Sequence, residues 1–146
     1  MKFLLDASAM VPMITRSGKK LIADSAQADF ITTDLAIYEA CNGLWKLATL
    51  LKTISLQNAQ DIATVLNELT AKNLIQTINF TMIDLPSTLN LAQANHITFY
   101  DASYIAAAQR VRAALVTEDQ KLCKVANNYV KTMSVAQLEK EFAKGT

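Results

Sequence analysis

Short apolar runs alternate with longer helical patterns along the chain, and this alternation restricts the possible folds more than any other feature. Five short runs have the character of strands: Lys2–Leu5, Phe30–Thr32, Thr81–Ile83, Ala114–Thr117 and Tyr129–Met133. Helical patterns separate them, and strands that alternate with helices form a parallel sheet that is covered on both faces. The sequence therefore predicts an α/β fold.

The helical patterns differ in length and in how they begin. Ala7–Met13 is expected to turn helical and to end or kink at Pro12, and Ser17–Ala26 is expected to form a separate short helix. The two longest patterns, Asp34–Leu51 and Leu56–Lys72, are joined by a brief polar turn, which predicts an antiparallel pair. The later helices are expected to open at Pro86 and to span Phe99–Arg112, Gln120–Asn127 and Val135–Lys144.

Composition limits the organisation and the compartment. The 146 residues are 51% hydrophobic and contain no repeat or Ser/Gly/Pro linker, so we expect one domain over residues 1–146. No stretch is long and apolar enough to cross a membrane, and Asp6 interrupts what would be the apolar region of a signal peptide. We therefore expect a cytoplasmic protein, whose net charge of +1 does not exclude a polyanionic partner.

The scarcity of histidine and glycine excludes several kinds of catalytic site. His96 is the only histidine, so neither a two-histidine ribonuclease mechanism nor an imidazole-rich zinc site can be assembled. The glycines Gly18, Gly43 and Gly145 form neither a phosphate-binding loop nor a dinucleotide fingerprint. No serine lies in a nucleophile-elbow motif. Carboxylates remain as the chemical groups from which a site can be built.

Four acids stand in apolar surroundings. Asp6 and Asp119 each close a predicted strand, whereas Asp101 and Glu39 interrupt apolar helices. Each also has a purely structural interpretation. Asp6 and Asp119 can be helix caps, Asp101 can form a capping box with Thr98, and Glu39 can lie on a solvated stripe.

Considered together, the acids predict a metal site. The carboxyl ends of parallel strands meet at one edge of the sheet, where such folds bind ligands, so Asp6 and Asp119 are expected to face the same crevice. If Asp101 joins them, two charges about 4 Å apart repel by about 4 kcal/mol at an effective dielectric of 20. Such a cluster needs a cation or a shared proton, and oxygen ligands favour Mg²⁺ or Mn²⁺.

Basic residues lie near these acids in the sequence. Lys121 and Lys124 follow Asp119, and Lys46 lies two turns beyond Glu39. Three more follow the first predicted helix: Arg16, Lys19 and Lys20. A rim of cations around an acidic metal site is suited to a phosphodiester backbone, although scattered solvated lysines are the alternative interpretation.

Four segments resemble, in order, the motifs of PIN-domain ribonucleases, and the likeness is closest to the small VapC-type toxins of prokaryotic toxin–antitoxin pairs. These segments are Leu5-Asp6-Ala7-Ser8-Ala9, Tyr38-Glu39-Ala40-Cys41-Asn42-Gly43-Leu44, Phe99-Tyr100-Asp101-Ala102-Ser103-Tyr104-Ile105-Ala106 and Leu115-Val116-Thr117-Glu118-Asp119. Each motif alone is weak, but four in order at sensible spacing are specific. The resemblance extends from the first strand to beyond Asp119.

The resemblance implies a PIN-like three-layer fold, with a central parallel sheet, helices on both faces and a protruding helical hairpin. It also implies a Mg²⁺- or Mn²⁺-dependent endoribonuclease that pairs with an antitoxin and forms a homodimer. The acidic set would be Asp6, Glu39, Asp101 and Asp119. Thr117 matches a position whose hydroxyl supports that set, and Ser8 and Asn42 match neighbours that bind water or position phosphate. Lysine must supply most of the basic rim, because arginine is scarce.

Two other functions compete with the nuclease. A phospho-aspartate phosphatase needs a second aspartate two residues after the first, where this chain has Ser8, and a receiver domain needs an acidic pair that is not in place. The second alternative is a PIN-like module that only binds RNA or a protein. An intact set of four acids argues against it, because a binding module has no reason to bring like charges together.

Overall fold

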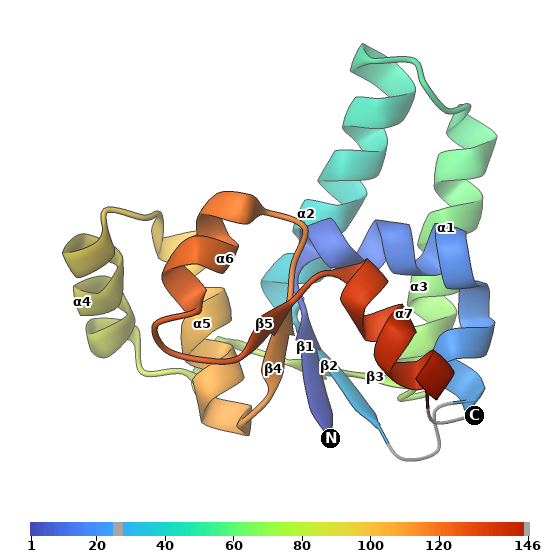
Figure 1. The fold of residues 1–146 in the computed structure, drawn as a ribbon. Coiled ribbons are helices and arrows are strands. Elements are labelled where there is room, and N and C mark those ends of the chain that lie inside the picture. The colour runs from blue at the N-terminus through green and yellow to red at the C-terminus, as the bar shows by residue number, and fades with distance from the viewer. Residues whose placement is uncertain (25–27, 145–146) are drawn as a thin grey trace.

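A single parallel sheet organises the computed structural model, which describes residues 1–24 and 28–144 (Figure 1). Its strands are β1 (Lys2–Leu5), β2 (Asp29–Thr33), β3 (Ile75–Ile78), β4 (Ala114–Val116) and β5 (Thr132–Met133). They lie in the order β3-β2-β1-β4-β5, and every pair is parallel. The predicted parallel α/β fold is thus confirmed.

Helices cover both faces of this sheet. They are α1 (Ala7–Asp24), α2 (Asp34–Trp45), α3 (Leu56–Ala71), α4 (Leu85–Asn95), α5 (Phe99–Val111), α6 (Gln120–Ala126) and α7 (Val135–Lys144). Helix α1 packs against α3 and α7 on one face, and α5 packs against α4, β1 and β4 on the other. Figure 1 shows the sheet between these two groups, which gives three layers.

Strand β1 lies at the centre of the sheet because it can be buried on both faces. Phe3, Leu4 and Leu5 are fully buried, and Phe30 of β2 stacks on Phe3 with ring centroids 5.9 Å apart. A strand without a solvent-facing side needs a continuous apolar run, and the first residues supply one. The chain becomes polar only at Asp6, where β1 reaches the carboxyl edge.

The helical hairpin formed by α2 and α3 extends past the carboxyl edge of the sheet (Figure 1). Helix α2 continues directly into a π-helical segment, Lys46–Leu50, before the chain turns back into α3 at the Ser55 N-cap. The predicted antiparallel pair is confirmed. Among the described residues, no helix combines the length and the apolar character needed to cross a membrane.

The prediction that the first helix ends near Pro12 is wrong, because α1 continues through this proline to Asp24. A proline inside a helix removes one backbone hydrogen bond, at a cost of about 3 kcal/mol. Buried side chains on both sides of Pro12 offset that cost: Ala9, Met10, Met13 and Ile14 all lie in the core. The expected separate helix over 17–26 is the second half of α1 up to Asp24, and its last two residues lie outside the described part of the chain.

The predicted strand at Thr81–Ile83 is also wrong. The third strand lies earlier, at Ile75–Ile78, and Phe80–Met82 forms a 3-10 turn (η2). Asn79 ends the strand, because its side chain accepts a hydrogen bond from the backbone N–H of Thr81. This local capping outweighs the strand preference of Thr81 and Ile83.

Candidate functional site

The candidate site is built around Asp6, the residue that follows β1. The register pairs Leu5 with Val116, so Asp6 and Thr117 are the next residues on neighbouring strands at the carboxyl edge. Asp6 is only 3% exposed. Its Oδ1 accepts a hydrogen bond from the backbone N–H of Ala9 (2.9 Å), so it caps α1 and faces the edge of the sheet at once.

Two hydroxyls hold the Asp6 carboxylate. Ser8 donates to Oδ1 (2.7 Å), and Thr117 donates to Oδ2 (2.5 Å). The two hydroxyl oxygens lie 3.2 Å apart, and each also accepts a backbone N–H, from Glu118 at Ser8 and from Asp119 at Thr117. This network joins residues more than a hundred positions apart and orients Asp6 before any ligand arrives.

The environment of Asp6 disfavours its charge. Burial raises the pKa of the carboxyl to about 6, against the hydrogen bonds from Thr117, Ser8 and Ala9, and repulsion from Asp119 adds to the increase. A carboxylate that is buried among hydroxyls, without a cation beside it, is costly to ionise. A positive ligand at this position would remove that cost.

Asp119 and Asp101 face the same region from different elements. Asp119 is the N-cap of α6, where its Oδ1 accepts from the backbone N–H groups of Lys121 and Leu122. Burial raises the pKa of Asp101 in the first turn of α5, and repulsion from Asp119 raises it further. Asp119 therefore acts electrostatically on both Asp6 and Asp101, so it lies near both carboxylates at the carboxyl edge of the sheet.

Glu39 joins the group through Tyr104, a residue that the sequence analysis did not assign to the site. The Tyr104 hydroxyl donates to Glu39 Oε2 at 3.0 Å, although the two residues lie 65 positions apart. Tyr104 is 2% exposed, and its pKa is raised by burial and by the charges of Glu39 and Asp6. Tyr104 lies one turn after Asp101 on α5, and this helical spacing is the sequence signal that could have assigned it to the site.

The polar and basic residues predicted around the acids lie on exposed surface. Asn42 and Lys46 are on the hairpin, whereas Lys121 and Lys124 are on α6. In the part of the chain that the structure describes, none of these four side chains is hydrogen-bonded to an acid. The structure thus bonds Ser8 and Thr117 to Asp6, brings Asp119 within electrostatic reach of Asp6 and Asp101, and leaves these four polar and basic residues at the periphery.

The donor set is suited to a hard divalent cation. Asp6, Asp101, Asp119 and Glu39 offer only carboxylate oxygens, and hydroxyls flank them. Within residues 1–24 and 28–144, however, no three acidic, histidine or cysteine side chains already lie close enough together to hold one ion. Asp119 is exposed and Asp101 is half-buried, so burial does not lock either side chain in its present orientation.

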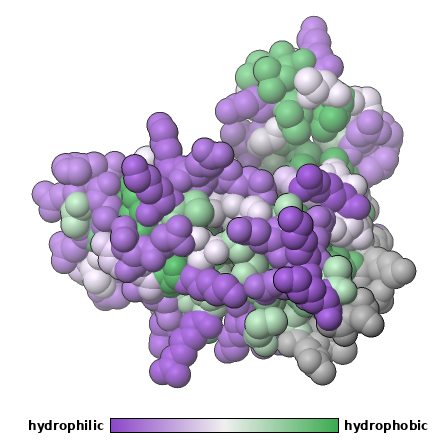
Figure 2. Space-filling model, in the orientation of Figure 1, coloured by the Kyte–Doolittle hydropathy of each residue, from purple (hydrophilic) through white to green (hydrophobic). Residues whose placement is uncertain are grey.

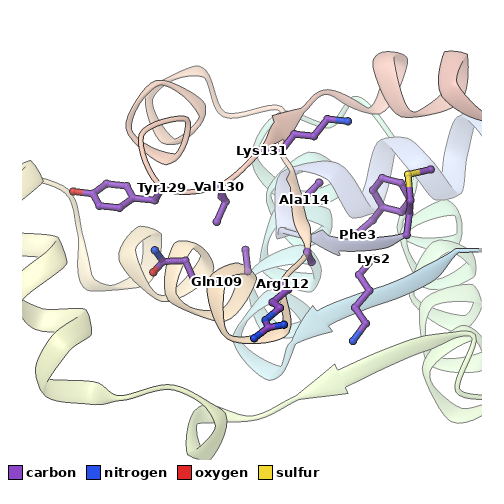
Figure 3. A pocket seen from close by; sticks show the side chains of 11 residues that line it. Lys2, Phe3, Gln109, Arg112, Ala114, Tyr129, Val130 and Lys131 are labelled. Atoms are coloured by element: carbon purple, nitrogen blue, oxygen red, sulfur yellow. The ribbon is translucent and has the colours of Figure 1, made fainter.

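The largest hollow that we describe lies at the opposite edge of the sheet. It has a volume of about 650 Å³. Its lining includes three basic residues, Lys2, Arg112 and Lys131, together with Gln109 and Tyr129 (Figure 3). It is formed by the amino ends of β1 and β4, so the length of the sheet separates it from Asp6. The acids and the basic hollow therefore do not form one site.

Comparison with known proteins agrees with this geometry. The PIN domain family matches residues 3–128. Ribonuclease VapC3 of Pyrobaculum aerophilum is 31% identical over 125 residues, which cover 84% of this chain and 92% of that protein. Exonuclease VapC9 of the same organism is 29% identical over 124 residues, or 83% of each chain.

Solved structures show the same fold. PAE2754 from Pyrobaculum aerophilum superimposes with a TM-score of 0.76 at 27% identity, covering 99% of this chain and 90% of that one. DNA-bound VapBC from Salmonella typhimurium superimposes with a TM-score of 0.62 at 12% identity, covering 92% and 98%. The match over most of the sequence, together with this fold, shows that the chain belongs to the PIN domain family and is similar to VapC nucleases.

Proposed function

We propose that this protein is a divalent-metal-dependent endoribonuclease and the toxin of a toxin–antitoxin pair. One observation carries the proposal: the buried Asp6 carboxylate is preoriented by two hydroxyls and repelled by Asp119 at the ligand-binding edge of the sheet. Such an arrangement is unfavourable for a chain that binds nothing there. It becomes favourable once a cation occupies the crevice.

The relatives support the reaction class. One relative is named a ribonuclease and another an exonuclease, so hydrolysis of nucleic acid phosphodiesters is their common chemistry. We assign RNA as the substrate and internal cleavage as the mode. We assign an antitoxin as a partner because a protein of the same fold is found in a VapBC complex.

The proposed metal ligands are Asp6, Asp101, Asp119 and Glu39. Mg²⁺ or Mn²⁺, when bound there, would supply an activated water and neutralise charge on the scissile phosphate. Glu39 has one oxygen engaged by Tyr104, which orients the carboxylate and would leave its other oxygen to hold the ion. Ser8 and Thr117 keep Asp6 in place throughout. Lys46, Lys121 and Lys124, with Asn42, would contact the flanking phosphates.

The exposed apolar residues at the tip of the α2–α3 hairpin support binding of a protein partner. Trp45, Leu50, Leu51 and Leu56 are all at least half exposed there. Figure 2 shows the apolar surface gathered over this tip. Contiguous exposed apolar surface marks interaction sites. Within the proposed function, the partners are an antitoxin and a second copy of this chain.

The test is cleavage of a mixed RNA pool by the purified protein, with Mg²⁺ or Mn²⁺ and with EDTA. Asp6→Asn is the critical variant, and Asp29→Asn is its matched control because Asp29 is an exposed acid at the opposite edge of the sheet. We expect cleavage by the wild type and by Asp29→Asn, with metal only, and none by Asp6→Asn. Equal cleavage by all three proteins would show that the site is wrong.

The alternative is a PIN-like module that binds RNA or protein without cutting. The same experiment separates it from the nuclease. Absence of cleavage, together with no increase in melting temperature on adding Mg²⁺ or Mn²⁺, would favour the binding module. Absence of cleavage with a clear increase would point instead to a selective nuclease whose RNA is missing from the pool.

A further inference from the structure

A small pocket lies beside the acidic crevice. It is lined by the first residues of the two helices that carry acids: Asp34 and Leu35 of α2, which bears Glu39, and Phe99 and Tyr100 of α5, which directly precede Asp101. The ends of β2 and β3 close it from below. The pocket therefore shares the carboxyl edge of the sheet with the proposed catalytic acids.

The size and the walls of the pocket limit what it can hold. Its volume is about 150 Å³. Pockets for drug-sized ligands begin at roughly 300 Å³, so this one is suited to a single planar ring system. Phe80 and Tyr100 line it while remaining 62% and 59% exposed, so their rings are accessible to an incoming ligand. Exposed aromatic rings are the usual platform on which unpaired bases stack.

A polar pair lies at the rim of the same pocket. The register pairs Thr33 with Ile78, so Asp34 and Asn79 are the next residues on neighbouring strands. Asp34 accepts from the Leu35 N–H through Oδ1, and Asn79 accepts from Thr81 through its own Oδ1. Among the hydrogen bonds of the described residues, none uses Asp34 Oδ2 or the amide nitrogen of Asn79, which leaves one acceptor and one donor available on residues that line the pocket.

We propose that this pocket binds one unpaired nucleobase of a single-stranded RNA, stacked on Phe80 and Tyr100 and hydrogen-bonded by Asp34 and Asn79. The inference rests on the proposed ribonuclease function and adds a subsite to it. The edge of a base presents both a donor and an acceptor that can pair with these two groups, whereas an apolar side chain of a protein would leave them bonded only to water. The base would anchor the RNA with an adjacent phosphate near the acids.

The test uses the full chain and a labelled single-stranded RNA that the wild type cleaves. Phe80→Ala removes the stacking surface, and Phe80→Tyr retains it. Leu89→Ala is the matched control because Leu89 is similarly exposed (58%) on α4 and does not line the pocket. Stacking of one base contributes about 1–3 kcal/mol, so we expect KM to rise about 5- to 150-fold in Phe80→Ala. We expect Phe80→Tyr and Leu89→Ala to resemble the wild type.

A set of RNAs with a single abasic position provides the second measurement. Binding is measured in EDTA. At one position of the RNA, loss of the base should weaken binding to the wild type by about the factor expected for Phe80→Ala. The same abasic RNA should bind Phe80→Ala no more weakly than the intact RNA does. If Phe80→Ala keeps the wild-type KM and responds to abasic RNA as the wild type does, the inference is refuted. It is also refuted if the wild type is a dimer that Phe80→Ala converts to a monomer, because the pocket would then be an interface between copies.

These outcomes separate the subsite from the proposed function. If cleavage requires metal but does not depend on Phe80, the proposed ribonuclease function stands and the base-binding pocket is refuted. If the wild type does not cleave RNA but binds it in EDTA, and this binding depends on Phe80 and on one base, the base-binding pocket stands and the proposed ribonuclease function is refuted.

Discussion

Replacement of Asp6 by asparagine should stabilise the metal-free protein at neutral pH. Burial raises the pKa of this carboxyl from 3.8 to about 6, so the folded state binds the proton more tightly than the unfolded chain. The ionised side chain then costs up to about 3 kcal/mol above pH 7, at about 1.4 kcal/mol per pKa unit. Asparagine removes the charge and can keep the hydrogen bonds.

The network around Asp6 can rearrange to accept an amide. The amide oxygen can replace Oδ1, which accepts from Ser8 and from the Ala9 N–H. The amide nitrogen can donate to Thr117, whose hydroxyl then donates to Ser8 at the observed 3.2 Å. No polar group loses its partner, so most of the electrostatic gain should appear as stability.

The assay is thermal unfolding in EDTA between pH 4 and pH 7.5, with Asp29→Asn as the control. A protein of this size gains about 2–4 °C per kcal/mol, so Asp6→Asn should melt up to about 10 °C higher than the wild type at pH 7. The difference should shrink as the pH falls from 6 towards 4 and should be lost only below the unfolded pKa of 3.8, where Asp6 is protonated in both states. Mg²⁺ or Mn²⁺ should raise the melting temperatures of the wild type and of Asp29→Asn, and should leave that of Asp6→Asn unchanged. A variant that melts lower than the wild type at pH 7 would refute the reasoning.

Three further variants test other parts of the site. Tyr104→Phe removes the hydrogen bond to Glu39, and kcat should fall about tenfold with KM unchanged, a split that a mere packing defect would not produce. Thr117→Val should lower the free energy of unfolding by about 1–3 kcal/mol in chemical denaturation, because the Asp119 N–H loses its acceptor. Lys121→Ala combined with Lys124→Ala should raise KM and flatten its dependence on salt, and an unchanged salt dependence would exclude these lysines from the RNA path.

Much of the fold could be predicted from the sequence because it depends on local patterns. The continuous apolar run before Asp6 indicated a buried strand, and alternation with helices indicated parallel pairing. The errors arose where local rules compete. Asn79 stops a strand that Thr81 and Ile83 would favour, and α1 continues through Pro12 because core packing on both sides outweighs one lost hydrogen bond.

The acids at strand ends could also be located in advance, since the carboxyl ends of parallel strands meet at one edge. Asp6 and Asp119 required no knowledge of side-chain packing. The partnership of Tyr104 with Glu39 could not be found in this way, because it depends on how α5 packs against α2. The exposed positions of Asn42 and Lys46 likewise depend on the direction in which the hairpin leaves the sheet.

The sequence by itself thus determined the fold class, the edge of the sheet at which the strand-end acids lie and the acidic character of that edge. These properties follow from periodicity and from the order of residues along single elements. Only the tertiary structure decided that Ser8 and Thr117 both bind one carboxylate, and that a small pocket opens beside Asp101. Such features join residues far apart in the chain, and their distances depend on how helices and strands pack rather than on any local preference.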